Sequence, residues 1–259
     1  MPFSTIEVTA AHGRGEITLN RPKKLNPLSA ETLRELAAAA AWLDERPDVK
    51  VVVVSGKGRA FSAGADVSVF TQDTDPGAAA RRADADAGRL MADAVESMRA
   101  ITIARIHGHC VGGGVVLAAA CDLRVAADST RFSIPEVDLG IPLAWGGIPR
   151  LVREIGPAMT KELVLTCRPF SAAQARELGF VNRVVSEGQL DQEVEELAEQ
   201  LLQKSALTLA ATKRAVNAAA QEIASTAGSW SDADSLMTAL GDPESRRAAL
   251  EYLQRLGRG

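Results

Sequence analysis

Cysteine is scarce in this chain, and the three that occur, Cys110, Cys121 and Cys167, form no CxxC pair and no Cys/His cluster. The usual ligand spacing of a zinc or iron–sulfur site is therefore missing, and we expect no metal site. An odd number of cysteines in apolar surroundings also argues against a disulfide framework. We expect all three to be reduced core residues of a cytoplasmic protein.

An excess of positive charge is also lacking, because 29 lysines and arginines face 33 aspartates and glutamates, for a formal net charge of −4. This balance favours neither nucleic acid nor an anionic membrane surface as a partner. No apolar run is long enough to span a bilayer, and no basic start followed by an apolar segment indicates a secretory signal. A phosphate-bearing ligand would be held by local basic side chains and backbone N–H groups.

What the sequence contains is an alternation of strand and helix patterns. Residues 5–9 and 15–20 alternate apolar and polar residues as a pair of strands does. Ser29 is a candidate cap for the alanine-rich helix of residues 30–46, and residues 50–56 (KVVVVSG) form an apolar run typical of a buried strand. Strand, helix and buried strand in succession predict an α/β fold.

Two later segments complete the predicted organisation. The stretch 71–89 is the most polar of the first half, and we expect a mobile loop there that runs into a helix ending near Arg99. Beyond Asp191 helical patterns follow one another, with apolar residues on one stripe. We therefore predict a core of residues 1–190 and a C-terminal helical region of residues 191–259.

Three glycines, residues 112–114, stand at a predicted strand-to-helix junction. In one interpretation they let the start of the helix pack closely against a neighbouring backbone. In the other, bare N–H groups at the helix N-terminus point at a ligand oxygen, assisted by the positive end of the helix dipole. The spacing matches neither GxGxxG nor a Walker-type loop, so a single oxygen is a better candidate ligand than a pyrophosphate.

A second glycine-containing segment, residues 60–66 (AFSAGAD), follows the apolar run of residues 50–56. Ala63 would lie where the chain leaves a sheet edge, with its N–H unpaired and small residues on both sides. One amide from each of the two segments would form an oxyanion hole for a thioester or another carbonyl group. Taken alone, a segment of this kind is more often a turn or a cap.

Three motifs in order, GRAFSAGADV, HGHCVGGGVVLAAACDLRVAA and FSIPEVDLGIPLAWGGIPRLV, resemble the crotonase superfamily of enoyl-CoA hydratases and isomerases. The resemblance implies an α/β spiral of ββα units, a C-terminal helical region that forms a homotrimer or hexamer, and an acyl-CoA thioester as substrate. Coenzyme A is then part of the substrate, and no separate cofactor is implied. The site residues that the resemblance implies are Glu136 in the place of a catalytic acid, the N–H groups of Ala63 and Gly113 as the oxyanion hole, and Ala63, Gly64, Ala65 and Asp66 alongside the adenine and pantetheine.

Val116 follows Gly113 by one helical turn and would face the substrate carbons next to the thioester. In the hydratases that this chain resembles, that position carries a second glutamate, which holds a water together with the first acid. The dienoyl-CoA isomerases of the superfamily place one acid there and another at the counterpart of Ala144. This sequence has neither acid.

A single carboxylate, Glu136, is sufficient for one reaction of this class. It removes a proton from a carbon acidified by the thioester and returns it two carbons away, while the oxyanion hole stabilises the enolate. This shift of a 3-enoyl-CoA to a 2-enoyl-CoA needs no water, and Val116 and Ile141 would exclude water. The alternative for Glu136 is a structural acid that satisfies nearby backbone N–H groups. Asp138 is a weaker candidate, because in an extended segment it would face away from Glu136.

Several other residues keep two interpretations. Lys23 and Lys24 either contact CoA phosphates or are solvated loop lysines, and Trp145 either lines the acyl pocket or packs in the core. His107 and His109 alternate along a strand, so at most one of them faces a pocket. The C-terminal LQRLGRG only loosely matches the basic, proline-containing tail that often completes the CoA site of this superfamily.

Three functions compete on this basis. We expect an acyl-CoA isomerase with Glu136 as its one base. Hydration of a 2-enoyl-CoA with a non-standard arrangement of water is an alternative within the same class. A non-catalytic acyl-CoA-binding protein would retain the two amides and have no use for an acid at position 136. Decarboxylation or hydrolysis of other acyl-CoA esters also stays open, because an oxyanion hole serves them as well.

Overall fold

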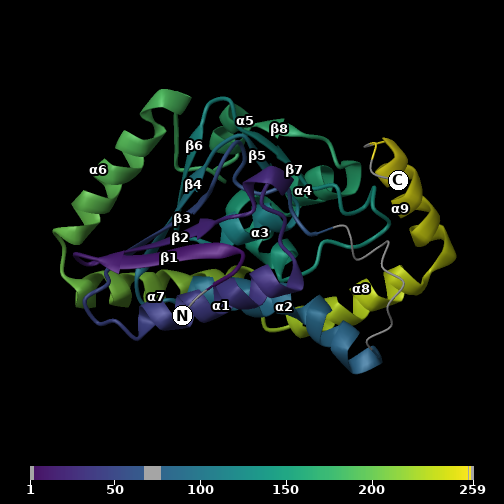
Figure 1. The fold of residues 1–259 in the computed structure, drawn as a ribbon, viewed down its shortest axis with the longest axis horizontal. Helices are drawn as coiled ribbons and strands as arrows, with labels where there is room; N and C mark the ends of the chain where they lie inside the picture. The colour runs from purple at the N-terminus through teal and green to yellow at the C-terminus, as the bar shows by residue number, and fades with distance from the viewer. Residues whose placement is uncertain (1–2, 67–76, 256, 258–259) are drawn as a thin grey trace.

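The larger sheet forms the centre of the molecule (Figure 1). The computed structural model describes residues 3–66, 77–255 and 257, and within them this sheet has six strands in the order β1-β2-β3-β4-β6-β9. The strands β1 and β2 pair antiparallel, and the other neighbours pair parallel. Their bounds are β1 Ile6–Ala11, β2 Arg14–Leu19, β3 Val51–Gly56, β4 Ile101–Ile106, β6 Leu123–Ala127 and β9 Arg183–Val185.

A smaller sheet of three strands, counted in the described residues, lies beside the first. It has the order β5-β7-β8, with β5 at His109–Val111, β7 at Arg131–Ser133 and β8 at Phe170–Ser171. The chain runs from a strand of the large sheet to a strand of the small sheet and then into a helix, as in β4–β5–α3 and β6–β7–α4. Each repeat advances one strand along both sheets, so the predicted α/β architecture of strand–strand–helix units is confirmed.

The helices follow local signals that the sequence contains. Helix α1 begins after Ser29, whose Oγ accepts the Thr32 N–H at 3.3 Å, and Ser171 forms a capping box with Gln174 at the start of α5. Helix α4 has a kink at Gly156, where φ is +73° and Pro157 follows. The first five bounds are α1 Ala30–Asp44, α2 Ala78–Ser97, α3 Gly113–Ala120, α4 Gly147–Thr166 and α5 Ala172–Glu177.

Both faces of the large sheet are covered. Helices α1, α2 and α3 pack on one face, in a cluster that includes Val52, Val54 and Ile106. Helix α6 covers the opposite face, where Val194 and Leu197 belong to the same cluster as Val51, Val53, Ile103 and Val125. Burial on both faces explains why β3 is a continuous apolar run instead of an alternating one.

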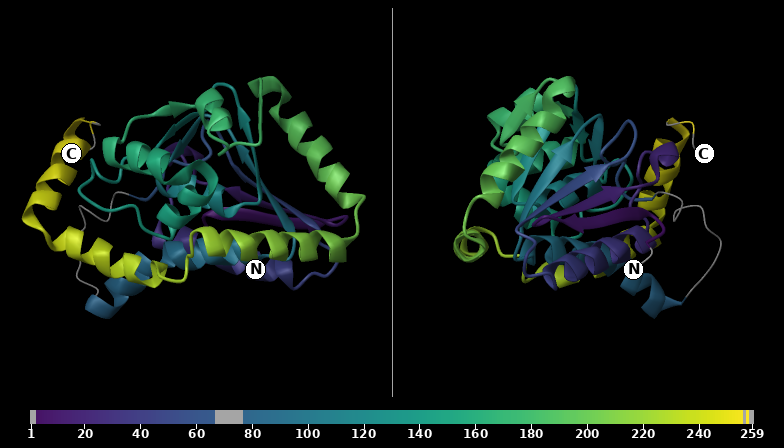
Figure 2. Two further views of the ribbon diagram at one scale, coloured as in Figure 1. Left: turned by 180° about the vertical axis from the view of Figure 1, so that it is seen from behind. Right: turned by 60° about the vertical axis from the view of Figure 1, so that its left-hand side comes forward.

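Four α-helices of the described residues follow β9 and surround the sheet from three sides (Figure 2). Helix α6 stands against the sheet at one end, α7 runs along the base, and α8 and α9 lie at the other end. Their bounds are α6 Leu190–Leu202, α7 Ala206–Ile223, α8 Asp232–Gly241 and α9 Pro243–Arg255. The division at residue 190 stays a prediction, but α6 packs as part of the sheet's core.

Two expectations need correction. Residues 78–89 are not a loop, because α2 begins at Ala78. Only a narrow stripe of this surface helix is buried, so most of its residues are polar or small, as they are in a loop. Residues 71–76 of that prediction lie outside the described residues.

Cys110 and Cys121 are buried as expected, whereas Cys167 is partly exposed at the end of α4. No helix in the described part is long and apolar enough to cross a membrane.

Candidate functional site

The three glycines before and within α3 each face a different neighbour. A methyl group on Gly112 would collide with Oε1 of Glu136, and one on Gly113 would collide with the ring of Trp145. A methyl group on Gly114 would lie 2.9 Å from Cβ of Ser62. Gly112 also has a positive φ of 48°, which other residues rarely adopt. The glycines therefore let a carboxylate and an indole ring reach the start of a buried helix.

The N-terminus of α3 leaves backbone donors without intrahelical acceptors. The Gly112 N–H donates to the Ser133 carbonyl at 2.8 Å, but Gly113, the first helical residue, has no acceptor among the described residues. The first N–H groups of a helix are unpaired by geometry, and the helix dipole adds partial positive charge there. The Gly113 N–H is therefore suited to a partly negative oxygen.

The glycine-containing segment after β3 also offers an amide without an acceptor among the described residues, but it is not the predicted one. The Ala63 N–H donates to the Leu25 carbonyl at 2.8 Å, and the Gly64 N–H donates to Oγ of Ser62 at 3.1 Å. The prediction that the Ala63 N–H lies in an oxyanion hole therefore does not hold in this structure. The Ala65 N–H, in contrast, has no acceptor within the described part of the chain.

The sequence does not indicate that the Ala65 N–H is free, because that depends on a contact with a distant part of the chain. Leu28 forms an isolated parallel bridge with Ala65, in which the Leu28 N–H donates to the Gly64 carbonyl and the Asp66 N–H donates to the Leu28 carbonyl. Such a bridge pairs the residues on either side of Ala65 and leaves its own N–H free. No local signal in the AFSAGAD stretch indicates that this bridge forms.

The two glycine-containing segments lie against each other. A methyl group on Gly64 would lie 2.7 Å from the Val111 carbonyl oxygen and 3.6 Å from the Gly113 nitrogen. Ser62 also bridges to Cys110 on β5. The segments that carry the Ala65 and Gly113 amides are therefore in direct contact and form one edge of the candidate site.

Glu136 lies beside this edge in a series of turns. Its side chain is 8% exposed, and Oε2 is buried without a hydrogen-bond partner among the described residues. Burial raises the pKa of the Glu136 carboxyl to about 7, and a hydrogen bond from its own backbone opposes this only in part. A carboxyl group with a pKa near neutrality can both accept and return a proton.

Asp138 lies in the same turns but in different surroundings. The Leu139 N–H donates to the Pro135 carbonyl at 3.0 Å, so the segment is not extended and the argument from alternation does not apply. Asp138 is nonetheless exposed, unlike Glu136. Helix α9 packs on this turn, since a methyl group on Gly140 would collide with the Ser245 carbonyl, and Tyr252 comes close enough for burial and Asp138 to raise its pKa.

Val116 is fully buried and contributes no polar group to the site. A methyl group on Gly147 would lie 2.8 Å from Cγ2 of Val116, so this side chain packs against the start of α4. Ala144, on the connection before α4, is also buried. The two positions where the resemblance places acids in other superfamily members are therefore apolar and packed.

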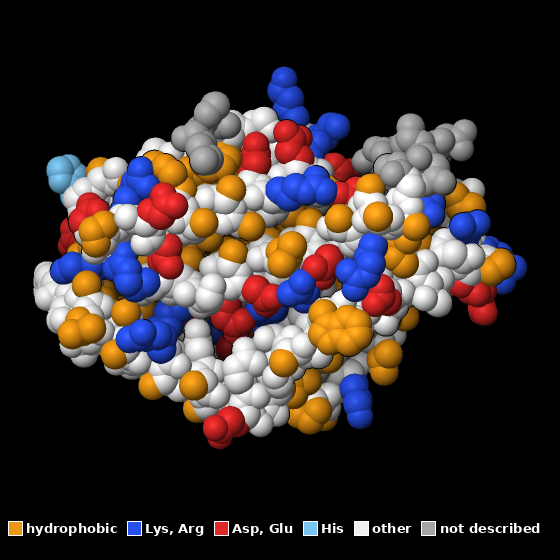
Figure 3. Space-filling view, turned by 90° about the horizontal axis from the view of Figure 1, so that it is seen from below, with side chains coloured by type: hydrophobic (Ala, Val, Ile, Leu, Met, Phe, Trp, Pro, Cys, Tyr) orange, Lys and Arg blue, Asp and Glu red, His pale blue; other side chains and the backbone are white. Residues whose placement is uncertain are grey.

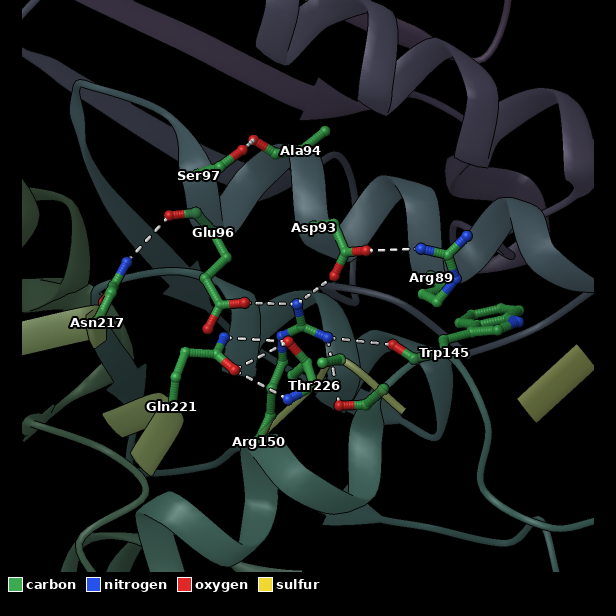
Figure 4. Close-up of polar contacts among 12 residues, drawn as sticks. Arg89, Asp93, Ala94, Glu96, Ser97, Trp145, Arg150, Asn217, Gln221 and Thr226 are labelled. Atoms are coloured by element: carbon green, nitrogen blue, oxygen red, sulfur yellow. Dashed lines mark hydrogen bonds and ion pairs between the residues drawn. The ribbon is translucent and has the colours of Figure 1, made fainter. Parts of the chain in front are cut away.

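Trp145 and Arg150 connect the site to the helices around it (Figure 4). Arg150 Nη1 donates to the carbonyl oxygens of Trp145 at 3.3 Å and Gly146 at 3.2 Å. Its Nη2 donates to Asp93 at 2.9 Å and to Glu96 at 2.6 Å, both on α2. The side chain of Arg150 is 1% exposed. A buried cluster of charges thus fixes the turn that carries Trp145.

Residues expected to hold coenzyme A lie near the other end of the edge. Lys23 and Lys24 are exposed on a short 3-10 helix, next to Leu25, whose carbonyl accepts the Ala63 N–H. Asp66 pairs with Arg21 at 3.1 Å. Lys24 is thus exposed and adjacent in the chain to Leu25, which contacts the segment of residues 63–66.

The histidines do not join the site. His107 is buried with its ring nitrogens bonded to the Gly58 carbonyl at 2.8 Å and to Arg105 at 3.0 Å, and burial lowers its pKa. His109 is exposed. Within the described residues, no group of three or more His, Cys, Asp or Glu side chains is arranged to hold a metal ion.

A hollow on another face is separate from this site. Figure 3 shows the molecule from below, where the surface is hollowed and acidic and basic side chains lie in the depression. A cavity of about 550 Å³ between α3, α4 and α7 is lined by Ala120, Arg153, Lys213 and Val216, among others. Its walls include the C-terminal end of α3, whereas Glu136 and the free amides lie at the N-terminal end.

Comparison with known proteins places this geometry in a family. A family model for enoyl-CoA hydratase/isomerase matches residues 10–256. A probable enoyl-CoA hydratase of Mycobacterium bovis is 39% identical over 219 residues, which cover 85% of this chain and 83% of that protein. A peroxisomal Delta(3,5)-Delta(2,4)-dienoyl-CoA isomerase of Arabidopsis thaliana is 38% identical over 224 residues, which cover 82% of this chain and 81% of that protein.

Solved structures agree with the sequence relatives. The crystal structure of an enoyl-CoA hydratase from Mycobacterium avium subsp. paratuberculosis is 26% identical, has a TM-score of 0.88, and covers 96% of this chain and 99% of its own. The fold and the sequence motifs therefore lead to the same assignment. This chain belongs to the enoyl-CoA hydratase/isomerase family, the crotonase superfamily that its motifs resemble.

Proposed function

We propose that this protein is an enoyl-CoA isomerase that converts a 3-enoyl-CoA to a 2-enoyl-CoA with Glu136 as its one acid/base. The Glu136 carboxylate removes a proton from C2, the electrons move into the thioester carbonyl, and the resulting dienolate takes the same proton back at C4. The double bond thereby moves from C3–C4 to C2–C3. The observation that carries the proposal is a buried carboxyl group of pKa about 7 that lies against Gly112, next to the Gly113 amide, which has no acceptor among the described residues.

The N–H groups of Ala65 and Gly113 are the donors for the enolate oxygen. Both lack acceptors among the described residues, and they belong to segments in direct contact. Preorganised donors of this kind stabilise the charge that develops on the oxygen, and the loss of one costs about 2.7–4 kcal/mol in comparable enzymes. Coenzyme A is held along residues 63–66, with Lys24 at its phosphates.

The apolar packing of Val116 favours isomerisation over hydration. Hydration of a double bond needs a water held in place and activated, and a valine can neither hold water nor carry a proton. Intramolecular proton return needs the opposite, a dry space in which the removed proton stays on Glu136. Val116, fully buried, provides that.

Hydration is the second candidate, and the names of relatives favour it. The Mycobacterium bovis relative is named a probable enoyl-CoA hydratase, and a relative of Syntrophomonas wolfei, 35% identical over 218 residues, is named a crotonyl-CoA hydratase. A hydratase reaction here would require Glu136 to activate water alone. Non-catalytic binding of an acyl-CoA would explain the two amides but not a buried acid with a raised pKa.

A homotrimer or a hexamer is the expected assembly. Helix α7 supports this with apolar residues that the single chain leaves open, because Val216 and Ile223, seven residues apart on one face of the helix, are 60% and 73% exposed. Exposed apolar side chains that recur along one helix indicate a protein contact. Light scattering or sedimentation of the purified chain measures the assembly directly.

The test of the function is a pair of assays with 3-enoyl-CoA and 2-enoyl-CoA thioesters on the wild type and Glu136→Gln. We expect the wild type to convert the 3-enoyl ester and Glu136→Gln to lose about 10²–10⁴-fold in kcat/KM, as removal of a general base does. The matched control is Glu162→Gln, at an exposed ion pair on α4, which should retain full activity.

The pH profile gives a second readout. Because only the ionised carboxylate accepts a proton, kcat/KM should rise with pH through the Glu136 pKa of about 7 and level off above it. Rapid hydration of the 2-enoyl ester by the wild type would contradict the proposed isomerase and show that the protein is a hydratase. Turnover of neither ester, with a CoA thioester still raising Tm, would favour the binding protein.

A further inference from the structure

Trp145 carries its indole ring between two helices. A methyl group on Gly88 of α2, or on Gly113 of α3, would collide with the ring. Both helices therefore present bare backbone to it, and the ring fills the gap between α2 and the first turn of α3. Residues at this junction have their backbone atoms next to the ring and cannot be enlarged without displacing it.

The turn beneath the ring is held by three elements. Trp145 has a φ of +64°, in the left-handed region that a bulky residue adopts only when its surroundings impose it. Arg150 of α4 donates to the carbonyl oxygens of Trp145 and Gly146, and the Gly146 N–H donates to Oδ2 of Asp232, at the start of α8, at 2.8 Å. Figure 4 shows the Arg150 contacts, which extend to Asp93 on α2.

The ring and the Glu136 carboxylate flank two consecutive residues. Oε1 of Glu136 lies against Gly112, and the ring lies against Gly113. A thioester oxygen on the Gly113 N–H, as the proposed function has it, places the first acyl carbons between the two side chains. On this placement, an acyl chain that extends from Gly113 toward α2 meets the indole, which lies against Gly88 of α2 and Gly113 of α3.

We propose that Trp145 is a specificity-determining residue that confines the substrate to short acyl chains, and that Arg150 and Asp232 are the residues that position it. The inference rests on the proposed function, because it takes the thioester to lie at Gly113. An indole is rigid, with two side-chain torsions, so a ring fixed by helices on both sides acts as a firm boundary. Replacing it with a smaller side chain should open the path for longer chains.

The experiment measures binding of butyryl-, octanoyl- and dodecanoyl-CoA by calorimetry to the wild type, Trp145→Phe and Trp145→Ala. Saturated esters cannot isomerise or hydrate, so the result does not depend on which reaction the enzyme performs. We expect the wild type to prefer butyryl-CoA over dodecanoyl-CoA and Trp145→Ala to shift that ratio by about tenfold or more toward the long ester. Trp145→Phe should shift it less in the same direction, and it preserves the fold should the alanine variant be unstable.

Two further variants distinguish a change in the shape of the acyl pocket from a general loss of structure. Trp230→Ala removes a tryptophan that is 59% exposed at the surface, and it should leave the ratio unchanged. Asp232→Ala removes the acceptor of the Gly146 N–H and should shift the ratio in the same direction as Trp145→Phe. An unchanged ratio in folded Trp145→Phe and Trp145→Ala would overturn this inference alone. Failure of the wild type to bind any of the three esters would overturn the proposed function together with it.

Discussion

Glu136 and Arg150 are buried charges on the same stretch of chain, and their surroundings are opposite. Glu136 has an oxygen with no partner in the described structure and a pKa raised to about 7. Arg150 is held by two carbonyl oxygens and by the carboxylates of Asp93 and Glu96, although its Nε has no acceptor among the described residues. Burial disfavours the charged form of Glu136, whereas Arg150 is buried together with acceptors for its charged group.

The difference supports the proposal that Glu136, and not Arg150, takes part in the reaction. A buried ion is tolerated when partners offset its desolvation, as at Arg150, and such a group is structural. A buried acid without partners shifts its pKa instead, and perturbed acids of this kind gather at functional sites. The two regions are joined, because the turn that Arg150 holds carries the Trp145 ring against Gly113, and Glu136 lies against the preceding residue, Gly112.

Removing Arg150 should have the largest effect on stability. Arg150→Met leaves Asp93, Glu96 and two carbonyl groups without their shared donor, and breaking such a buried cluster lowers the free energy of unfolding by about 3–5 kcal/mol. Urea denaturation at neutral pH measures the change. The matched control is Arg168→Met, at an ion pair whose side chains are 36% and 46% exposed, where we expect a small change. Equal effects of the two variants would show that the Arg150 cluster is not structural.

Neutralising Glu136 should change stability in the opposite direction. A carboxyl group whose pKa rises from 4.5 to about 7 on folding binds its proton more tightly in the folded state. Stability from this group is thus present below pH 4.5 and is lost as pH rises through 7, by about 3 kcal/mol in all.

Glu136→Gln should accordingly be more stable than the wild type at pH 8 by up to about 3 kcal/mol, with the gain disappearing near pH 4.5. Denaturation curves of both proteins at the two pH values measure it. A gain that is independent of pH would mean that the wild-type carboxylate has partners that the described residues do not supply. The variant would then be stabilised for another reason, such as better packing.

Crowding the Glu136 carboxylate should have a smaller, kinetic effect. Gly112→Ala puts a methyl group against Oε1 of Glu136 at a positive φ, so the carboxylate must move. A displacement of about 1 Å at a reacting group costs roughly 10²-fold in rate, and we expect kcat/KM to fall by that amount. Gly241→Ala is the control, because no atom lies within 4 Å of its added methyl group. Similar activity in both variants would show that Glu136 need not lie against Gly112.

Much of this arrangement follows from the sequence, and the remainder depends on contacts between distant segments. Periodicity and capping predict the α/β layers, the Ser29 helix and the strand that Val51 begins, because those signals are local. The sequence motifs predict that Glu136 and Gly113 lie in one site, through their resemblance to the superfamily. The free N–H at Ala65, instead of Ala63, depends on a bridge to Leu28, thirty-odd residues away in the chain and invisible to any local pattern.

Misreadings have the same origin. Residues 78–89 have the polarity of a loop, and only packing against α1 and α3 identifies the buried stripe of Ala87, Met91 and Val95 on α2. The Arg150 cluster joins α4 to Asp93 and Glu96 of α2, and Arg153 of α4 extends it from Glu96 to the Ala224 carbonyl after α7; no spacing in the sequence connects these residues. A charged side chain read from sequence alone is expected at the surface.

The smallest effect on kcat/KM is expected for Asp138→Asn. This variant tests whether Glu136 acts as the base because it is buried, or whether a second carboxylate nearby contributes. Asp138 is two residues from Glu136, on the same turns, but it is exposed to solvent, and its charge helps to raise the pKa of Tyr252 on α9. If burial without partners is what prepares Glu136, Asp138→Asn should leave kcat/KM within about twofold of the wild type and keep the acid limb of the pH profile, since no general base is removed. If both carboxylates share the proton, the limb should shift and the rate should fall in Asp138→Asn as in Glu136→Gln. Measuring kcat/KM of the two variants from pH 5 to 9 distinguishes one isolated base from a pair of carboxylates. It thereby distinguishes an isomerase with a single acid/base from an enzyme with a second acid.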